Sequence, residues 1–298
     1  MKRIPLFCLA VLLAAQDQTF RMNVQLVSVL ATVKNAKGGL VGSLTKDDFT
    51  ILDEGEPQPI RVFDKQSGIP LVIALLIDSS GSTAKDLKFE KESGSRFIHN
   101  IVRPQDSLCI FSFNQTVEQY GGFTSDFTQL ETSLKRITSE GGTSLYDAIF
   151  LASEQLRQHQ GRRVIVLVTD GDDTTSIANY QQALHAAQDA DAAIYGVIVV
   201  PIPGSVGRNI GGEHALITLA GDTGGRTFQP SAATALDPIF KDLAEELRTQ
   251  YVLGFYAQPL AKGKTSAARG YRHVEVKTTA PGFTVQARKG YYFREALP

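Results

Sequence analysis

Residues 71–82 read Leu-Val-Ile-Ala-Leu-Leu-Ile-Asp-Ser-Ser-Gly-Ser, and this stretch decides the fold. The run 71–77 is apolar without alternation, which is typical of a central parallel strand covered on both faces. Two further unbroken apolar runs follow at 164–168 and 193–200. Segments with helical periodicity separate the runs, so the sequence predicts a doubly wound, mostly parallel α/β sheet.

The remaining elements of this unit are predicted from the spacing of their apolar residues. Strands are expected at 107–113 and, as an edge strand, at 116–120. Helices are expected near 87–101, 127–137, 145–156, 180–190, 214–220 and 233–247, the fifth of them short. Together these elements fill residues 69–249, which we interpret as one α/β domain.

The segments on either side of this domain read as strands. In the segment 23–67, Phe49 and Ile51 alternate with polar residues, as do Ile60 and Val62, and a hairpin is expected between them. The segment 250–298 also contains alternating stretches. Because domain termini often lie close together, we expect the two segments to pair as one small β-sandwich into which the α/β domain is inserted. Two separate β appendages are the alternative.

The first residues are typical of a targeting segment. Met1-Lys2-Arg3 is basic, and residues 4–15 form an apolar run that ends in small residues. We interpret residues 1–16 as a signal peptide, because the run is too short to cross a bilayer. A membrane anchor or a buried strand is the alternative. The mature chain is expected to have no membrane span and to be secreted or periplasmic.

Charge and cysteine content exclude several classes of protein. The chain has 30 basic and 31 acidic residues and a net charge of −1, so no electrostatic footprint for nucleic acid is present. Removal of the signal peptide leaves one cysteine, Cys109, within an apolar stretch. A lone cysteine in such surroundings is expected to be a small buried hydrophobic residue.

Oxygen-bearing side chains follow three separate segments of the predicted sheet. Asp78, Ser80 and Ser82 come directly after the first apolar strand, and Asp170 follows another. Thr143 precedes the helix near 145–156. Ligands of doubly wound sheets bind beyond the carboxyl ends of the strands. We therefore expect these five residues to meet at one rim, although helix caps and an ordinary turn would also explain each segment alone.

The five side chains offer oxygen ligands without sulfur or imidazole. A hard cation suits this set, Mg²⁺ first, with Mn²⁺ or Ca²⁺ as alternatives, whereas Zn²⁺ does not. Hydroxyls are neutral, so two carboxylates leave the ion under-neutralised and open to an external anion. A partner protein could supply that anion as a carboxylate. Asp172 and Asp173 continue the acidic run and are expected to be solvated loop residues.

The motif Asp78-x-Ser80-x-Ser82, with Thr143 and Asp170 in the same order and context, resembles the von Willebrand factor type A domain over 69–249. The resemblance implies a metal-ion-dependent adhesion site at these five residues, where Ser80, Ser82 and Thr143 contact the ion and an aspartate acts partly through water. The stretches 44–55, 251–255 and 287–292 resemble a bacterial subgroup, the acidobacterial-type VWFA-related proteins.

These observations favour a secreted or periplasmic binding protein that grips a partner's acidic group through Mg²⁺. A metal-dependent hydrolase that uses the same rim is the alternative from another class, but no nucleophile motif and no His or Glu accompanies the metal motif. We therefore predict no catalytic residues and no enzyme activity. A scaffold with a vestigial site is the third hypothesis.

Overall fold

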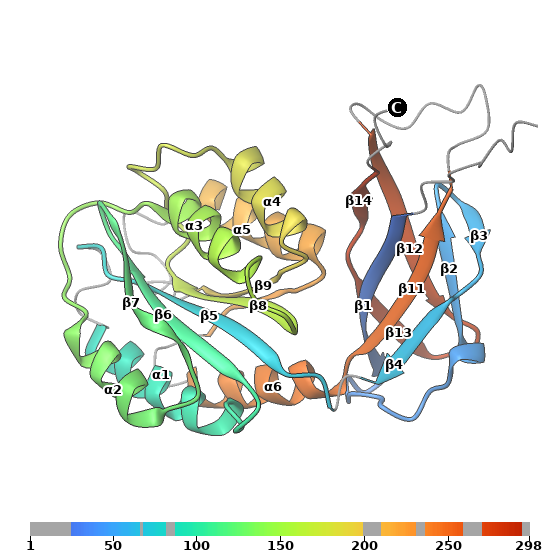
Figure 1. Ribbon diagram of the computed structural model, residues 1–298, viewed down its shortest axis with the longest axis horizontal. Coiled ribbons are helices and arrows are strands. Elements are labelled where there is room, and N and C mark those ends of the chain that lie inside the picture. Colours follow the sequence, from blue (N-terminus) through green and yellow to red (C-terminus); the bar gives the residue numbers. More distant parts are fainter. Residues whose placement is uncertain are drawn as a thin grey trace, which may run out of the picture.

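The computed structural model describes residues 25–65, 68–81, 87–198, 210–230, 236–258 and 270–293. The predicted signal peptide and Ser82 lie outside the described residues. Figure 1 shows an α/β unit beside a β-sandwich. None of the helices in the described ranges combines the length and apolar character that a membrane crossing requires.

The α/β unit is built on a six-stranded sheet in the order β10-β9-β8-β5-β6-β7. The strands are β5 (Leu71–Asp78), β6 (Ser107–Phe113), β7 (Val117–Thr124), β8 (Arg162–Thr169), β9 (Ala193–Ile198) and β10 (Thr227–Phe228). All neighbours run parallel except β7, which is antiparallel to β6 at one edge. The doubly wound, mostly parallel fold predicted from the apolar runs is confirmed.

Helices cover both faces of this sheet (Figure 1). One face carries α1 (Leu87–Ile101), α2 (Phe127–Arg136) and α6 (Leu236–Thr249). The other carries α3 (Leu145–Leu156), α4 (Tyr180–Asp189) and α5 (Ile210–Thr223). Every residue of β5 is buried between the two layers, because its apolar side chains point alternately into each.

Helix α5 corrects one prediction. A short helix was expected near 214–220, but α5 has 14 residues, the same length as α6. Gly211 and Gly212 are poor helix formers, so helix propensity alone does not predict the first turn of α5. That turn packs closely on Gly171, since a Cβ placed there would lie 3.3 Å from the Glu213 nitrogen. Tertiary packing thus outweighs the local preference.

The β-sandwich consists of two four-stranded sheets, in the orders β13-β1-β11-β4 and β14-β12-β2-β3. Its strands are β1 (Gln25–Asn35), β2 (Phe49–Asp53), β3 (Glu56–Gln58), β4 (Val62–Lys65), β11 (Tyr251–Ala257), β12 (Tyr271–Thr278), β13 (Phe283–Ala287) and β14 (Gly290–Tyr292). β1 pairs antiparallel with β11, and β2 pairs antiparallel with β12. Each sheet therefore contains strands from both ends of the chain, which enclose a shared apolar core.

The hairpin in the N-terminal segment differs from its prediction. Strand β2 pairs with β3 across a two-residue turn, in which Glu54 and Gly55 both have positive φ, 51° and 81°. Such a turn matches the twist of a tight hairpin. Pro59 has no N–H to donate and follows the end of β3. Val62 therefore does not pair with β2 but begins β4, which joins β11 in the opposite sheet.

The sandwich meets the α/β unit at the amino ends of the central strands, because β4 leads into β5 and α6 leads into β11. At this junction the buried amide of Gln250 donates to the hydroxyl of Thr32 at 2.5 Å and to that of Tyr195 at 2.6 Å. The buried Glu246 side chain accepts ion pairs from Lys34 on β1 at 3.2 Å and from Arg226 at 2.8 Å. Side chains of both units thus hold the junction together.

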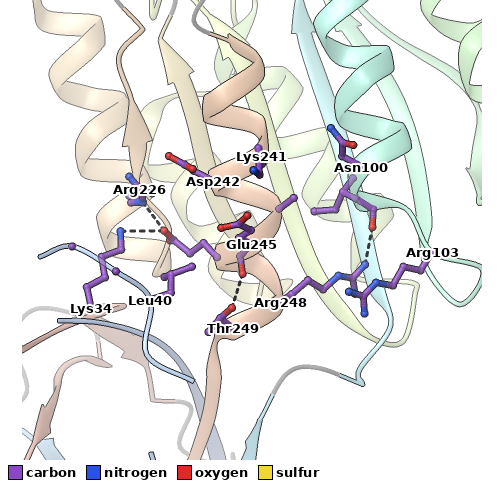
Figure 2. A pocket seen from close by; sticks show the side chains of 15 residues that line it. Lys34, Leu40, Asn100, Arg103, Arg226, Lys241, Asp242, Glu245, Arg248 and Thr249 are labelled. Atoms are coloured by element: carbon purple, nitrogen blue, oxygen red, sulfur yellow. Dashed lines mark hydrogen bonds and ion pairs between the residues drawn. The ribbon is translucent and has the colours of Figure 1, made fainter. Parts of the chain in front are cut away.

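A groove of about 850 Å³ runs along this junction between α6, the end of α1 and the turn after β1. Figure 2 shows Lys34 and Arg226 pointing toward the same side of α6, and Arg248 reaching toward the end of α1. The Arg248 guanidinium donates to the Ile101 carbonyl at 2.8 Å and pairs with the buried Asp106. The groove lies at the end of the sheet opposite to Asp78. Several of the charged side chains that line it form the ion pairs described above.

Replacing Glu246 by Gln is expected to lower the free energy of unfolding by about 2 kcal/mol, because two cations then lose a buried counter-charge. Lys34 and Arg226 are partly exposed, at 25% and 29%, so water limits the loss. Urea denaturation measures the effect. The matched control is Glu245→Gln, an exposed neighbour on the same helix. Equal midpoints for the two variants would contradict the ion-pair argument.

Candidate metal centre

Two neighbouring strands bring the predicted carboxylates to one rim. β5 and β8 are parallel and in register, with Ile77 opposite Val168. The residues that follow these positions therefore leave the sheet side by side. Asp78 is the last residue of β5 and is fully buried, whereas Asp170 follows the end of β8 and is partly exposed.

The Asp78 carboxylate accepts hydrogen bonds from neutral donors. The backbone N–H of Ser80 donates to Oδ1 at 2.9 Å, and the Thr169 hydroxyl donates to Oδ2 at 2.7 Å. Burial raises the pKa of Asp78 to about 6, and the nearby Asp170 charge adds to this, although the two hydrogen-bond donors act against it. A buried carboxylate beside a second one is costly, and a divalent cation would offset that cost.

The loop that carries Ser80 is joined to the loop before Thr143. Hydrogen bonds connect residues 79–81 to residues 139–141: Gly81 N to Gly141 O at 3.1 Å, Glu140 N to Ser79 O at 2.9 Å, and Ser139 Oγ to Ser80 O at 2.7 Å. Ser80 is 2% exposed. These bonds bring the segment that begins at Asp78 against the one that leads to Thr143.

The loop after β8 closes on Thr143 from the other side. The Thr143 N–H donates to the Thr174 hydroxyl at 2.9 Å, and its carbonyl accepts from Thr174 N at 2.8 Å and Thr175 N at 3.1 Å. A Cβ at Gly142 would lie 2.7 Å from the Thr175 methyl group, so a side chain here would force the threonine side chains of this loop to move. Thr143 is 3% exposed as a result.

The same loop is anchored on the first turn of α3. Asp173 Oδ1 accepts from Tyr146 N at 3.2 Å and from the Ser176 hydroxyl at 2.5 Å. Asp147 in turn accepts from the backbone N–H groups of Ile177 at 3.0 Å and Ala178 at 2.7 Å. Asp173 is thus a structural acceptor and not the solvated loop residue that we expected.

The structure therefore brings together the segments of Asp78, Ser80, Thr143 and Asp170, while Ser82 lies outside the described residues. The donor set fits a hard cation, because it combines two carboxylates with hydroxyl oxygens. Within the described ranges, no cluster of three or more His, Cys, Asp or Glu side chains could hold a metal. An ion at this rim would consequently depend on the hydroxyls as well.

Sequence reasoning assigned no role to Thr169, although it stands directly before Asp170. Its position as the last residue of β8, in the motif stretch Thr169-Asp170-Gly171, is the signal that could have indicated a contact with the end of β5. Thr174 and Asp147 were missed for another reason, since contacts between loops leave no periodic pattern.

Replacing Thr169 by Val is expected to raise the pKa of Asp78 further above its ordinary value of 3.8, because a hydrogen bond that favours the carboxylate is lost. A pH titration of the carboxyl carbon by NMR in metal-free protein measures the change. Thr169→Ser keeps the hydroxyl and should leave the pKa near that of the wild type. An unchanged pKa in the Val variant would exclude this hydrogen bond as a determinant.

Part of the α/β unit matches a known domain family. Residues 73–173 match the family model of the von Willebrand factor type A domain. No curated protein sequence matches the chain. The solved von Willebrand factor type A protein from Catenulispora acidiphila has 13% sequence identity and a TM-score of 0.51, and the match covers 92% of this chain and 75% of that one.

Two further structures share the fold. The von Willebrand factor domain of the type V pili tip protein Mfa5 from Porphyromonas gingivalis has 12% identity and a TM-score of 0.50, covering 59% of this chain and 94% of that one. The pilus adhesin SpaC from Lactobacillus rhamnosus GG, in its open conformation, has 10% identity and a TM-score of 0.51. That match covers 82% of this chain but only 41% of SpaC. The α/β unit of this chain therefore has the fold of a von Willebrand factor type A domain, and residues 73–173 within it match the family model.

Proposed function

We propose that this protein is a non-catalytic binding protein that holds Mg²⁺ with Asp78, Ser80, Ser82, Thr143 and Asp170. The observation that carries the proposal is the pair of carboxylates at the ends of β5 and β8, of which Asp78 is buried and has its pKa raised to about 6. When bound, the ion supplies a positive charge that a partner's carboxylate can coordinate. The residues of the chain hold the ion in place and leave one side open to the partner.

The comparisons support a role in protein interaction. Mfa5 is described as a pilus tip protein and SpaC as a pilus adhesin, and both share the domain fold. The basic and apolar first residues support export, so we propose that the protein acts outside the cytoplasm, in the periplasm or beyond. Capture of proteins by the immobilised chain would identify the partner.

The groups around the two carboxylates of the rim favour binding over catalysis. A hydrolase needs a general acid or base near the ion. Two histidines lie elsewhere in the fold: His99 pairs with Glu131 at 2.8 Å between α1 and α2, and His185 contacts Tyr292 at 2.5 Å. Glu213, whose backbone packs on Gly171, is buried. The hydrogen bonds described at the rim come instead from hydroxyls and backbone N–H groups.

Capture of partners from the surface proteins of the source cells tests this function. The full chain is immobilised in Mg²⁺ and in EDTA, alongside Asp78→Ala in Mg²⁺. The expected result is a protein retained only by the wild type and released by EDTA. Generic phosphatase and esterase assays run in parallel. Metal-dependent turnover that disappears in Asp78→Ala would overturn the proposal in favour of an enzyme.

A further inference from the structure

The most exposed large apolar side chains lie on the two segments that adjoin the proposed metal rim. Seven large apolar residues of the described ranges are exposed, and five of these have exposed fractions between 37% and 46%. Ile177 is 95% exposed and Ile210 is 72% exposed. Exposed apolar residues that are scattered singly need no explanation, but a group of them at a site marks a contact surface.

Both isoleucines belong to segments that adjoin Gly171. Ile177 belongs to the loop that follows Gly171, and Ile210 begins α5, whose first turn packs on Gly171. The backbone of Gly212 lies within 3.5 Å of the position that a Gly171 Cβ would take. The two rim isoleucines, Ile177 and Ile210, therefore belong to the two segments that meet at Gly171, the loop that follows it and the helix that packs on it.

Ile177 is held in its exposed position. Its N–H and that of Ala178 both donate to the carboxylate of Asp147, so the loop is fixed on α3. Phe150 is 41% exposed and lies three positions after Asp147, on the same face of the helix. Ile177 is thus exposed to solvent on a loop whose backbone hydrogen bonds are satisfied. The exposed Phe150 adds apolar surface on the helix that holds this loop.

The charge of the rim limits what can cover these side chains. Asp172 and Asp173 follow Asp170 in the loop after β8, and the carboxylate of Asp147 binds the same loop, so this side of the rim carries further negative charge. One acidic group of a partner would be attracted by the ion, but additional acidic groups would approach these aspartates. Like charges that meet at an interface are unfavourable.

We propose that the partner is a protein segment with one carboxylate flanked by large apolar side chains, which cover Ile177 and Ile210. This inference rests on the proposed function, since the carboxylate is the group that the ion would bind. The apolar neighbours supply specificity, because covering an isoleucine removes apolar surface from water. A segment with several acidic residues in a row is disfavoured.

Selection from a random peptide library displayed on phage tests the inference with the full chain. Peptides are bound to the immobilised protein in Mg²⁺ and eluted with EDTA. We expect enrichment of a single Asp or Glu with a large apolar residue within two positions of it. In Ile177→Ser the acidic residue should still be enriched, the apolar preference should fall, and the wild-type peptides should bind about tenfold more weakly.

The matched control is Ile217→Ser, an exposed isoleucine on α5 with 42% exposure, which should select the same peptides as the wild type. Both variants should keep the thermal midpoint, because the altered side chains are exposed. Acidic peptides without apolar neighbours, or an unchanged preference in Ile177→Ser, would overturn the inference while the proposed function stands. Selection without any Mg²⁺-dependent acidic residue would instead refute the proposed function.

Discussion

In Asp78→Asn, Mg²⁺ should no longer raise the thermal midpoint, and the metal-free variant should be more stable than the metal-free wild type at pH 7.5. A ligand at a hundred times its dissociation constant stabilises a protein by about 2.7 kcal/mol, and this gain is what the variant loses. A pKa raised from 3.8 to about 6 means that the charged Asp78 destabilises the metal-free fold by about 3 kcal/mol at neutral pH. Asparagine removes that cost while keeping the shape.

The pH dependence follows from the same carboxyl group. The pKa of Asp78 is higher in the folded than in the unfolded chain, so the metal-free fold binds more protons between about pH 4 and pH 6. Its stability therefore falls as the pH rises through this range and then levels off. Stabilisation by Mg²⁺ changes in the opposite sense, because the ion needs the carboxylate and loses it as the pH falls below about 6. Differential scanning fluorimetry at several pH values, with Mg²⁺ or EDTA, measures both trends.

Asp172→Asn is the matched control for this variant, since it removes a partly exposed carboxylate from the neighbouring loop, which follows β8. It should keep the response to Mg²⁺. If Asp78→Asn still gains as much stability from Mg²⁺ as the wild type does, the ion binds elsewhere and the proposed function fails. If Asp78→Asn is merely less stable at every pH, the carboxylate has a structural role.

Gly225→Ala is expected to lower the free energy of unfolding by about 4 kcal/mol or more. A Cβ at this position would stand 1.9 Å from the carbonyl oxygen of Ile194 and 2.6 Å from its carbon. Both are backbone atoms of β9, so no side chain can move aside to relieve the clash. The backbone at Gly225 must therefore shift. That shift would strain the hydrogen bond from Gly225 N to Ala220 O, 2.9 Å long, which ends α5.

Chemical denaturation of the purified variant, or its loss to the insoluble fraction on expression, measures the effect. The control is Gly122→Ala on the edge strand β7, where nothing lies within 4 Å of the added Cβ and φ is not positive. That variant should stay within about 1 kcal/mol of the wild type. Similar stabilities for the two variants would show that the segment between α5 and β10 adapts easily.

The sequence predicted those features that depend on local patterns. The unbroken apolar run 71–77 identified a strand buried on both faces, and this placed Asp78 at its carboxyl end. Cys109 was also interpreted correctly as a buried small residue: it is 0% exposed, and burial raises the pKa of its thiol to about 11. In both cases the burial follows from the residues themselves and needs no knowledge of partners.

Contacts between distant segments could not be predicted in the same way. Thr174 meets Thr143 through loops without periodicity, and Gln250 meets Thr32 across 218 positions of the chain. The hairpin error has a local cause, because the two residues Glu54 and Gly55 suffice for the turn and shorten the second strand. Alternation of apolar and polar residues does not show at which residue one strand stops pairing with its neighbour.

The mixed origin of the sandwich sheets imposes an order on folding. Strand β1 needs β11 as its partner, with Gln25 opposite Ala257, so the N-terminal strands cannot pair until synthesis has passed residue 257. Joining Lys65 to Tyr251 in an otherwise unfolded chain costs about 5 kcal/mol of loop-closure entropy. Folding of the α/β domain removes most of this entropy cost beforehand, because β5 and α6 bring the two segments close together. We therefore expect the domain to fold first, and the strands that precede it to stay unpaired, and open to aggregation, until it does.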